Sequence, residues 1–305
     1  MIEKFMQEFV EEARETGLPV EAVAAGDESK VIFEHHFAPD LPRNIYSHTK
    51  SFLSAAVGIA AAEGKLSLED RLADFFPDRL PEHPSPRLLS IRLKDLLTMS
   101  SGFGEAYLMG DDRRNGTGFP DYMAYMLSRE VKEEPGSRFC YSTADSILAG
   151  RMLEKAVGMR LSEYLYRRLF EPMDIGFPVW ENDPQGHPIG GGGMFLKIAD
   201  MMKLGQLFLA GGRFRGQRLV EESWVREAAA KQIETEPDSA DIWRCGYGYQ
   251  FWRSPYPDSY RADGAFGQIT TVLPRAGLTV SVQCPETGDF ERVKRALHEI
   301  VLSRI

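Results

Sequence analysis

The sequence is poor in cysteine, and this shortage narrows the class of protein. The three cysteines in 305 residues (Cys140, Cys245 and Cys284) cannot all pair and show no C-x-x-C spacing. Such usage is typical of a reducing compartment, so we expect a cytoplasmic protein. Charged side chains from Glu3 and Lys4 onward interrupt any apolar segment near the first residue, which argues against a signal peptide.

Long apolar stretches, basic runs and metal-ligand spacings are also absent. No uncharged apolar stretch approaches the roughly 20 residues that span a bilayer. The net charge is −9 and no basic run exceeds two residues, so we expect neither nucleic acid nor a membrane as partner. The six histidines show no H-E-x-x-H spacing, and there is no P-loop, no G-x-G-x-x-G after a strand and no G-x-S-x-G. We therefore expect no metal and no cofactor, and a small molecule as the ligand.

Periodicity predicts strands near both ends of the chain and helices between them. Two short strands follow an amphipathic helix over residues 2–13, and four more alternate with turns before a last helix. The predicted fold is α+β and two-lobed: residues 1–65 and 240–305 form an antiparallel sheet domain flanked by the terminal helices, and residues 66–239 form an inserted, mostly helical lobe. The predicted strands are Val20–Ala25, Lys30–Phe37, Tyr247–Trp252, Ser259–Arg261, Gln268–Leu273 and Leu278–Gln283, and the last helix is Asp289–Arg304.

Ser47 and Lys50 stand at the start of a helix that continues without a charge from Ser51 to Ala62. A helix that is apolar or small on all sides is buried, and burial disfavours the charged form of a lysine. Residues three apart share a helix face, so the Ser47 hydroxyl and the Lys50 amine lie together. A neutral lysine can accept the proton of a serine, which makes the pair a candidate nucleophile and activator.

The spacing alone does not decide between this interpretation and a simpler one. With 20 serines and 11 lysines, about 0.7 S-x-x-K tetrapeptides are expected by chance in the chain, and motifs need context. In the alternative, Ser47 only caps the helix and Lys50 is solvated.

Two later segments carry further candidate site residues. Tyr141 lies on a loop just before a helix for which Thr143 is the expected N-cap; its hydroxyl is either a proton relay or an ordinary half-buried aromatic group. The segment Asp263-Gly264-Ala265 lies between two predicted strands. It is either a plain hairpin turn or an edge where Gly264 lets a ligand approach a backbone N–H.

Two glycine-containing regions are open to two interpretations each. The run Gly190–Gly193 precedes a helix and serves either close packing or the cradling of an anion. The loop Gly102–Pro120 is either a moving flap beside the site or a solvated surface loop.

These motifs occur in an order that resembles the serine β-lactamase and penicillin-binding-protein superfamily, in particular its class C-like branch of esterases, D-amino-acid peptidases and 6-aminohexanoate-dimer hydrolases. The similarity covers most of the chain and implies a β-lactamase/transpeptidase-like fold. The segments that carry it are Asn44–Phe52, Leu96–Gly102, Tyr141–Thr143, Gly191–Gly212 and Asp263–Gln268.

The resemblance implies a role for each matching residue. Ser47 would be the acylated nucleophile, with Lys50 and Tyr141 sharing the task of accepting its proton. The backbone N–H groups of Ser47 and Ala265 would bind the oxyanion, next to Gly264. Thr143 stands where many relatives have asparagine, and residues 262–264 offer no cation for a substrate carboxylate.

Both departures weaken the case for β-lactam or D-alanyl-D-alanine substrates. We therefore expect a serine hydrolase that cleaves a small ester or amide. The alternatives are a binding or sensing protein of the same fold that acylates slowly or not at all, and a structural protein in which the motifs coincide by chance.

Overall fold

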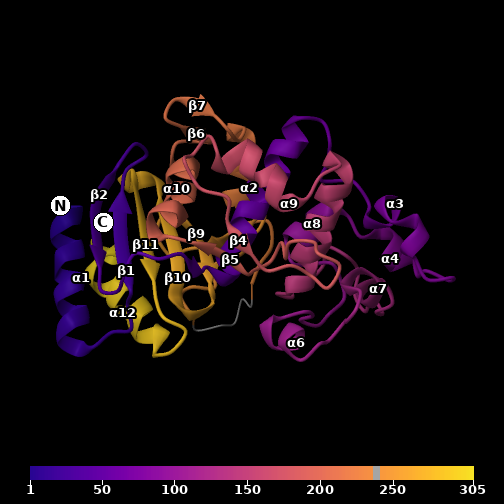
Figure 1. The fold of residues 1–305 in the computed structure, drawn as a ribbon, viewed down its shortest axis with the longest axis horizontal. Helices are drawn as coiled ribbons and strands as arrows, with labels where there is room; N and C mark the ends of the chain where they lie inside the picture. Colours follow the sequence, from indigo (N-terminus) through magenta and orange to yellow (C-terminus); the bar gives the residue numbers. More distant parts are fainter. Residues whose placement is uncertain (236–240) are drawn as a thin grey trace.

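The computed structural model describes residues 1–235 and 241–305, and an antiparallel sheet forms one half of it (Figure 1). Its strands run in the order β2-β1-β11-β10-β9-β8. Strand β1 pairs with β11 so that Ala22 faces Gln283, which joins the two ends of the chain in the middle of the sheet. The strands are β1 (Ala22–Gly26), β2 (Val31–His36), β8 (Trp252–Arg253), β9 (Tyr260–Gly264), β10 (Gln268–Leu273) and β11 (Leu278–Gln283).

Helices cover both faces of this sheet. Helices α1 (Ile2–Thr16) and α12 (Phe290–Ile300) pack side by side against one face, at the left of Figure 1. Helix α10 (Ile198–Leu209) packs against β1, β10 and β11. Successive strand residues point to opposite faces, and in β1 the odd-numbered apolar residues join the α1 side while Ala22 and Ala24 join the α10 side.

The remaining helices form the other half of the molecule around α2 and α8, to the right in Figure 1. They are α2 (Thr49–Ala62), α3 (Leu72–Phe75), α4 (Pro86–Ser90), α5 (Leu93–Leu97), α6 (Gly110–Arg114), α7 (Tyr122–Leu127), α8 (Thr143–Val157), α9 (Leu161–Leu165) and α11 (Glu222–Ala229). Short 3₁₀ turns lie at η1 (Tyr46–His48), η2 (Pro77–Arg79), η4 (Ala265–Gly267), η5 (Pro274–Ala276) and η6 (Leu302–Arg304), and η3 (Tyr166–Phe170) is a π-helical segment. A three-stranded sheet has the order β3 (Arg43–Asn44), β5 (Met194–Leu196), β4 (Val179–Trp180). A two-stranded sheet pairs β6 (Arg213–Phe214) with β7 (Gln217–Arg218).

The predicted fold class is confirmed: the sheet is antiparallel throughout, and the two terminal helices flank it. The predicted domain limits stay a prediction, and the limit between residues 239 and 240 lies outside the described residues. Helix α10 belongs to the predicted inserted lobe by sequence, yet it packs on the sheet.

The predicted strand Tyr247–Trp252 is wrong for most of its length, because only Trp252 lies in a strand. Gln250 takes a left-handed φ of 63°, and the Gly248 N–H donates to the Phe251 carbonyl at 2.8 Å. The chain therefore turns tightly where alternating residues predict an extended segment.

Along the described residues, no helix combines the length and the apolar composition that crossing a bilayer requires.

Helix α2 is buried from Thr49 to Ala60 because small residues let its neighbours approach closely. A Cβ at Gly58 would lie 2.4 Å from the Trp224 indole, whereas a Cβ at Gly150 in α8 would meet nothing closer than 3.4 Å.

We predict that Gly58→Ala and Gly150→Ala have different effects on stability. Alanine favours a helix by about 1 kcal/mol over glycine, but overpacking a core costs about 1–3 kcal/mol. Gly58→Ala should therefore lower the free energy of unfolding in urea, and Gly150→Ala should leave it unchanged or raise it. Equal effects of the two substitutions would contradict the packing described for α2.

Candidate active site

Ser47 lies in the 3₁₀ turn η1, at the point where β3 leads into the buried helix α2. The preceding Tyr46 has a left-handed φ of 46°, and its N–H donates to Asn44 Oδ1 at 2.9 Å. A non-glycine residue rarely takes this conformation without support from its surroundings. The turn places the Ser47 side chain at the surface of a cleft, where it is partly exposed.

The Lys50 amine is held beside Ser47 in a dry environment. Its side chain is 1% exposed, and Nζ lies 3.1 Å from Ser47 Oγ and 2.6 Å from the Gly191 carbonyl oxygen. Burial lowers the pKa of Lys50 to about 7; the positive charge of Arg113 lowers it further and the negative charge of Asp145 opposes this. Near neutral pH the amine is therefore able to accept a proton.

Tyr141 completes a group of three side chains. Lys50 Nζ lies 5.0 Å from the centre of its ring, and Ser47 is near enough to the Tyr141 hydroxyl to act on its pKa. The ring stacks on Trp252 with centroids 5.5 Å apart and meets Tyr247 edge-on at 6.2 Å. Burial among these rings raises the pKa of Tyr141, while the Ser47 hydrogen bond acts in the opposite direction.

Glycines let the backbone approach this group closely. A Cβ at Gly191 would lie 3.1 Å from Lys50 Nζ, and one at Gly190 would lie 2.5 Å from the Ser146 carbonyl oxygen. These contacts favour the close-packing interpretation of the glycine run. A Cβ at Gly264 would lie 2.2 Å from the Ile45 carbonyl oxygen, so the end of β9 lies directly against the turn that carries Ser47.

A cleft of about 470 Å³ opens beside Ser47. Thr143 and Ala265 line it together with Ser47, and the Thr143 hydroxyl contacts Met109 Sδ at 3.3 Å. The loop 102–120 contributes helix α6 to the wall, so it is part of the cleft. Whether that loop moves stays a prediction.

The structure thus brings together the predicted site residues Ser47, Lys50, Tyr141, Thr143 and Ala265. One local prediction is wrong: Thr143 is the first residue of α8 and Ser142 occupies the N-cap position. The roles of these residues in a reaction stay predictions.

Several residues of the site were not singled out from the sequence. Arg113 lines the cleft and forms an ion pair with Glu181 at 3.1 Å. Gln250 is buried, accepts a hydrogen bond from Ser146 Oγ at 2.6 Å and donates to the Leu97 carbonyl at 2.9 Å, which ties three segments together. No local pattern marks such contacts, because their partners lie far away in the sequence.

The sequence predicts no cation at residues 262–264 that could bind a substrate carboxylate. The preceding residue, Arg261, does carry a positive charge, but its guanidinium group is already paired within the protein. Arg261 is 4% exposed and pairs with Asp263 at 2.8 Å. Its other nitrogens donate to the carbonyls of Arg253 and Trp243 at 2.6 and 3.0 Å. The guanidinium group is therefore committed to the protein.

A model of the Beta-lactamase family matches residues 2–302, so the chain belongs to that family. Membership indicates the fold of that family. The chain is 24% identical over 221 residues to the 6-aminohexanoate-dimer hydrolase of Paenarthrobacter ureafaciens. This match covers 66% of this chain and 55% of that protein.

Solved structures share the fold over nearly the whole chain. The structure of a family VIII carboxylesterase is 15% identical in sequence and superposes with a TM-score of 0.75. The match covers 100% of this chain and 97% of the carboxylesterase chain. The octameric penicillin-binding protein homologue from Pyrococcus abyssi is 19% identical with a TM-score of 0.74, covering 97% and 76%. The chain matches about half or less of the length of the curated relatives.

His48, next to Ser47, is fully buried. Its Nε2 lies 2.9 Å from Thr270 Oγ1, and its Nδ1 has no hydrogen-bond partner among the described residues. Burial lowers the pKa of His48 to about 3.

We predict that His48 makes the protein sensitive to acid. Between pH 6.5 and 3 the unfolded state binds a proton on His48 that the folded state does not. The free energy of unfolding therefore decreases as the pH is lowered, by up to about 1.4 kcal/mol per pH unit. His48→Gln should reduce this slope in urea denaturation between pH 7.5 and 5, and the same substitution at the exposed His83 should not. Identical slopes for wild type and His48→Gln would disprove the assignment.

Proposed function

We propose that this protein is a serine hydrolase that forms an acyl-enzyme on Ser47 and cleaves a small ester or amide. One observation carries the proposal: Lys50 Nζ lies 3.1 Å from Ser47 Oγ and is shielded from water, while Ser47 itself lines an open cleft. A serine hydroxyl is a weak nucleophile unless an adjacent base takes its proton, and this arrangement supplies such a base.

The residues then have distinct tasks. Ser47 Oγ attacks the carbonyl carbon while its proton passes to the Lys50–Tyr141 pair. The two groups are coupled, so we assign the proton to the pair. The backbone N–H groups of Ser47 and Ala265 stabilise the oxyanion beside Gly264. The proton then passes to the leaving alcohol or amine as its bond to the carbonyl breaks, and water releases the acyl group from Ser47.

The site favours an uncharged ester or amide over a substrate that must present a carboxylate to β9. The Arg261 guanidinium is committed to Asp263 and to two carbonyls. Thr143 supplies a hydroxyl where an amide would offer both a donor and an acceptor. The names of two similar proteins, a family VIII carboxylesterase and a 6-aminohexanoate-dimer hydrolase, are consistent with an ester or amide substrate.

A second candidate function is a binding or sensing protein of the same fold. Thr143 and the committed Arg261 favour it, because both reduce the groups available to orient a substrate. Steady turnover of any ester would exclude it, and a ligand that stabilises the protein without turnover would support it.

We predict that Ser47→Ala abolishes acylation. A p-nitrophenyl ester should give a burst of nitrophenol, and a fluorophosphonate should add one adduct that intact-mass spectrometry detects. Both signals should vanish in Ser47→Ala and persist in Ser128→Ala, which changes an exposed serine. Absence of an adduct in the wild type would refute the proposal.

We also predict that Lys50→Arg is not a conservative change. Arginine stays protonated and cannot accept the Ser47 proton, and loss of a general base costs about 10²–10⁴-fold in rate. In the wild type the rate of acylation should rise with pH through about 7, since only neutral Lys50 accepts a proton. Lys155→Arg, an exposed lysine of α8, is the matched control. Near-normal acylation by Lys50→Arg would contradict the role of the amine.

A further inference from the structure

Tyr46 and Phe266 flank the two backbone groups that bind the oxyanion in the proposed reaction. Tyr46 directly precedes Ser47, and Phe266 directly follows Ala265. Both take a left-handed φ, 46° and 61°, which a bulky residue rarely adopts unless its surroundings or a function require it. Their rings meet edge to face with centroids 4.9 Å apart, and both line the cleft that contains Ser47. The two strained turns thus build one aromatic wall beside Ser47.

A carboxylate group lies at this aromatic wall. The Tyr46 hydroxyl donates a hydrogen bond to Glu286 Oε1, and the exposed Glu286 also lines the cleft. Burial and the neighbouring Glu286 carboxylate raise the pKa of Tyr46, so the phenol keeps its proton. Phe266 is held from its other side by Phe290, with ring centroids 5.4 Å apart. The cleft therefore presents two aromatic rings and a carboxylate in one place.

The other charged groups of the cleft wall neutralise one another in pairs. Arg113 donates to Glu181 through Nε at 3.2 Å and through Nη2 at 3.1 Å. Arg114 pairs with Asp111 at 2.7 Å within α6. Both arginines and both of their partners line the cleft. The negative charge of Glu286 is therefore the one on this wall that has no counter-charge among the described residues.

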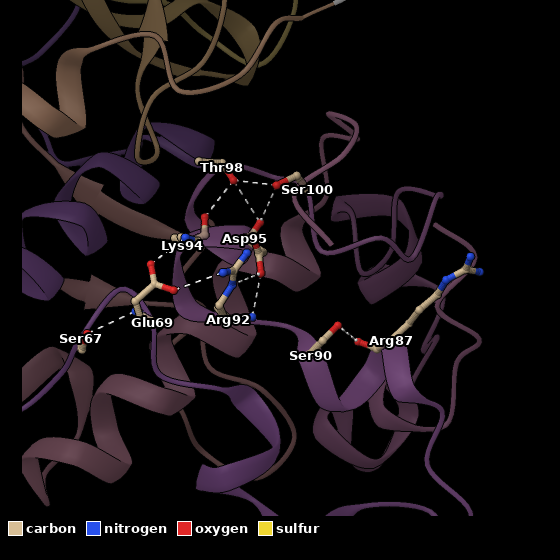
Figure 2. A network of polar contacts seen from close by, with 9 residues as sticks. All are labelled: Ser67, Glu69, Arg87, Ser90, Arg92, Lys94, Asp95, Thr98 and Ser100. Atoms are coloured by element: carbon tan, nitrogen blue, oxygen red, sulfur yellow. Dashed lines mark hydrogen bonds and ion pairs between the residues drawn. The ribbon is translucent and has the colours of Figure 1, made fainter. Parts of the chain in front are cut away.

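Carboxylates in the helical half of the molecule show how the chain balances such a charge elsewhere. Glu69 accepts hydrogen bonds from Lys94 Nζ at 2.6 Å and from Arg92 Nη1 at 3.2 Å (Figure 2). Glu286 instead receives the hydroxyl of Tyr46, which carries no charge. A cation that comes from outside the described part of the chain can therefore approach the Glu286 carboxylate.

We infer that Tyr46, Phe266 and Glu286 form a binding site for an ammonium group of the substrate, so that the protein acts on esters or amides that carry an organic cation. The inference rests on the proposed function and specifies its substrate class. An ammonium group is attracted to an aromatic ring and to a carboxylate, and the cleft offers both side by side. The reacting ester or amide group itself is uncharged, because the positive charge lies on a substituent.

The charges around the site favour a cation over an anion. The chain carries a net charge of −9, which raises the concentration of cations near its surface. Arg114 is the positive group that acts on Tyr46, and its ion pair with Asp111 offsets its charge. A substrate carboxylate in the same place would meet Glu286 as a like charge.

The first experiment measures binding without catalysis, by NMR titration of Ser47→Ala. Acetylcholine should bind about tenfold more tightly than 3,3-dimethylbutyl acetate, in which a carbon atom replaces the charged nitrogen. Glu286→Gln in the same background should reduce this preference to about threefold or less. Glu28→Gln, which changes an exposed glutamate between β1 and β2, should leave it unchanged. Equal affinities for the two esters would overturn the inference.

Two further variants separate cation binding from a structural role of the Tyr46–Glu286 hydrogen bond. Tyr46→Phe removes that hydrogen bond but keeps the ring and the carboxylate, so the preference for acetylcholine should persist. Phe266→Leu removes a ring and should lower the preference. If Tyr46→Phe lost the preference to the same extent as Glu286→Gln, the hydrogen bond would serve only to hold the chain in place, and the inference would be wrong.

The second experiment measures turnover. In the wild type kcat/KM should be about tenfold higher for acetylcholine than for 3,3-dimethylbutyl acetate. Glu286→Gln should remove most of this difference, and an undiminished ratio in that variant would contradict the inference. Failure of the wild type to hydrolyse either ester counts against the proposed function and not against the ammonium site, on which the binding measured in Ser47→Ala decides.

Discussion

Keeping the Lys50 amine out of water, yet within reach of Ser47 Oγ, is the constraint that the rest of the site satisfies. An ammonium group loses its hydration when it is buried, so its neutral form becomes competitive near pH 7. The Gly191 carbonyl replaces part of that hydration at 2.6 Å. A partner with a full negative charge in the same place would keep the proton on the amine, and Ser47 would then lack a base.

This constraint accounts for the small residues around the site. Helix α2 is buried from Thr49 to Ala60, which it achieves with alanine, serine and glycine in positions where neighbours come close. Gly190 and Gly191 in one segment and Gly264 in another let two further backbone segments reach the same place. A methyl group on any of the three would lie at 3.1 Å or less from atoms it would have to displace. Close backbone contact excludes water where side chains would leave gaps.

The sequence predicted the parts of the site that depend on local spacing. Ser47 and Lys50 are three residues apart, and strands β10 and β11 begin and end at the predicted residues. The fold class followed from the change of periodicity along the chain, and the sheet confirms it. Contacts between distant segments could not be predicted from local patterns. The turn at Gln250, the ion pair of Arg113 with Glu181 and the lack of a hydrogen-bond partner for Asp145 Oδ2 among the described residues each depend on residues tens to hundreds of positions apart.

The measurement that tests this account most directly is a titration of the Lys50 side chain in the resting protein, followed by the chemical shift of its ¹³C-labelled ε-carbon and assigned with Lys50→Met. The account predicts a midpoint near pH 7, with the neutral amine present under the conditions in which Ser47 reacts. A midpoint at about 10 or above, as for a lysine in water, would contradict it.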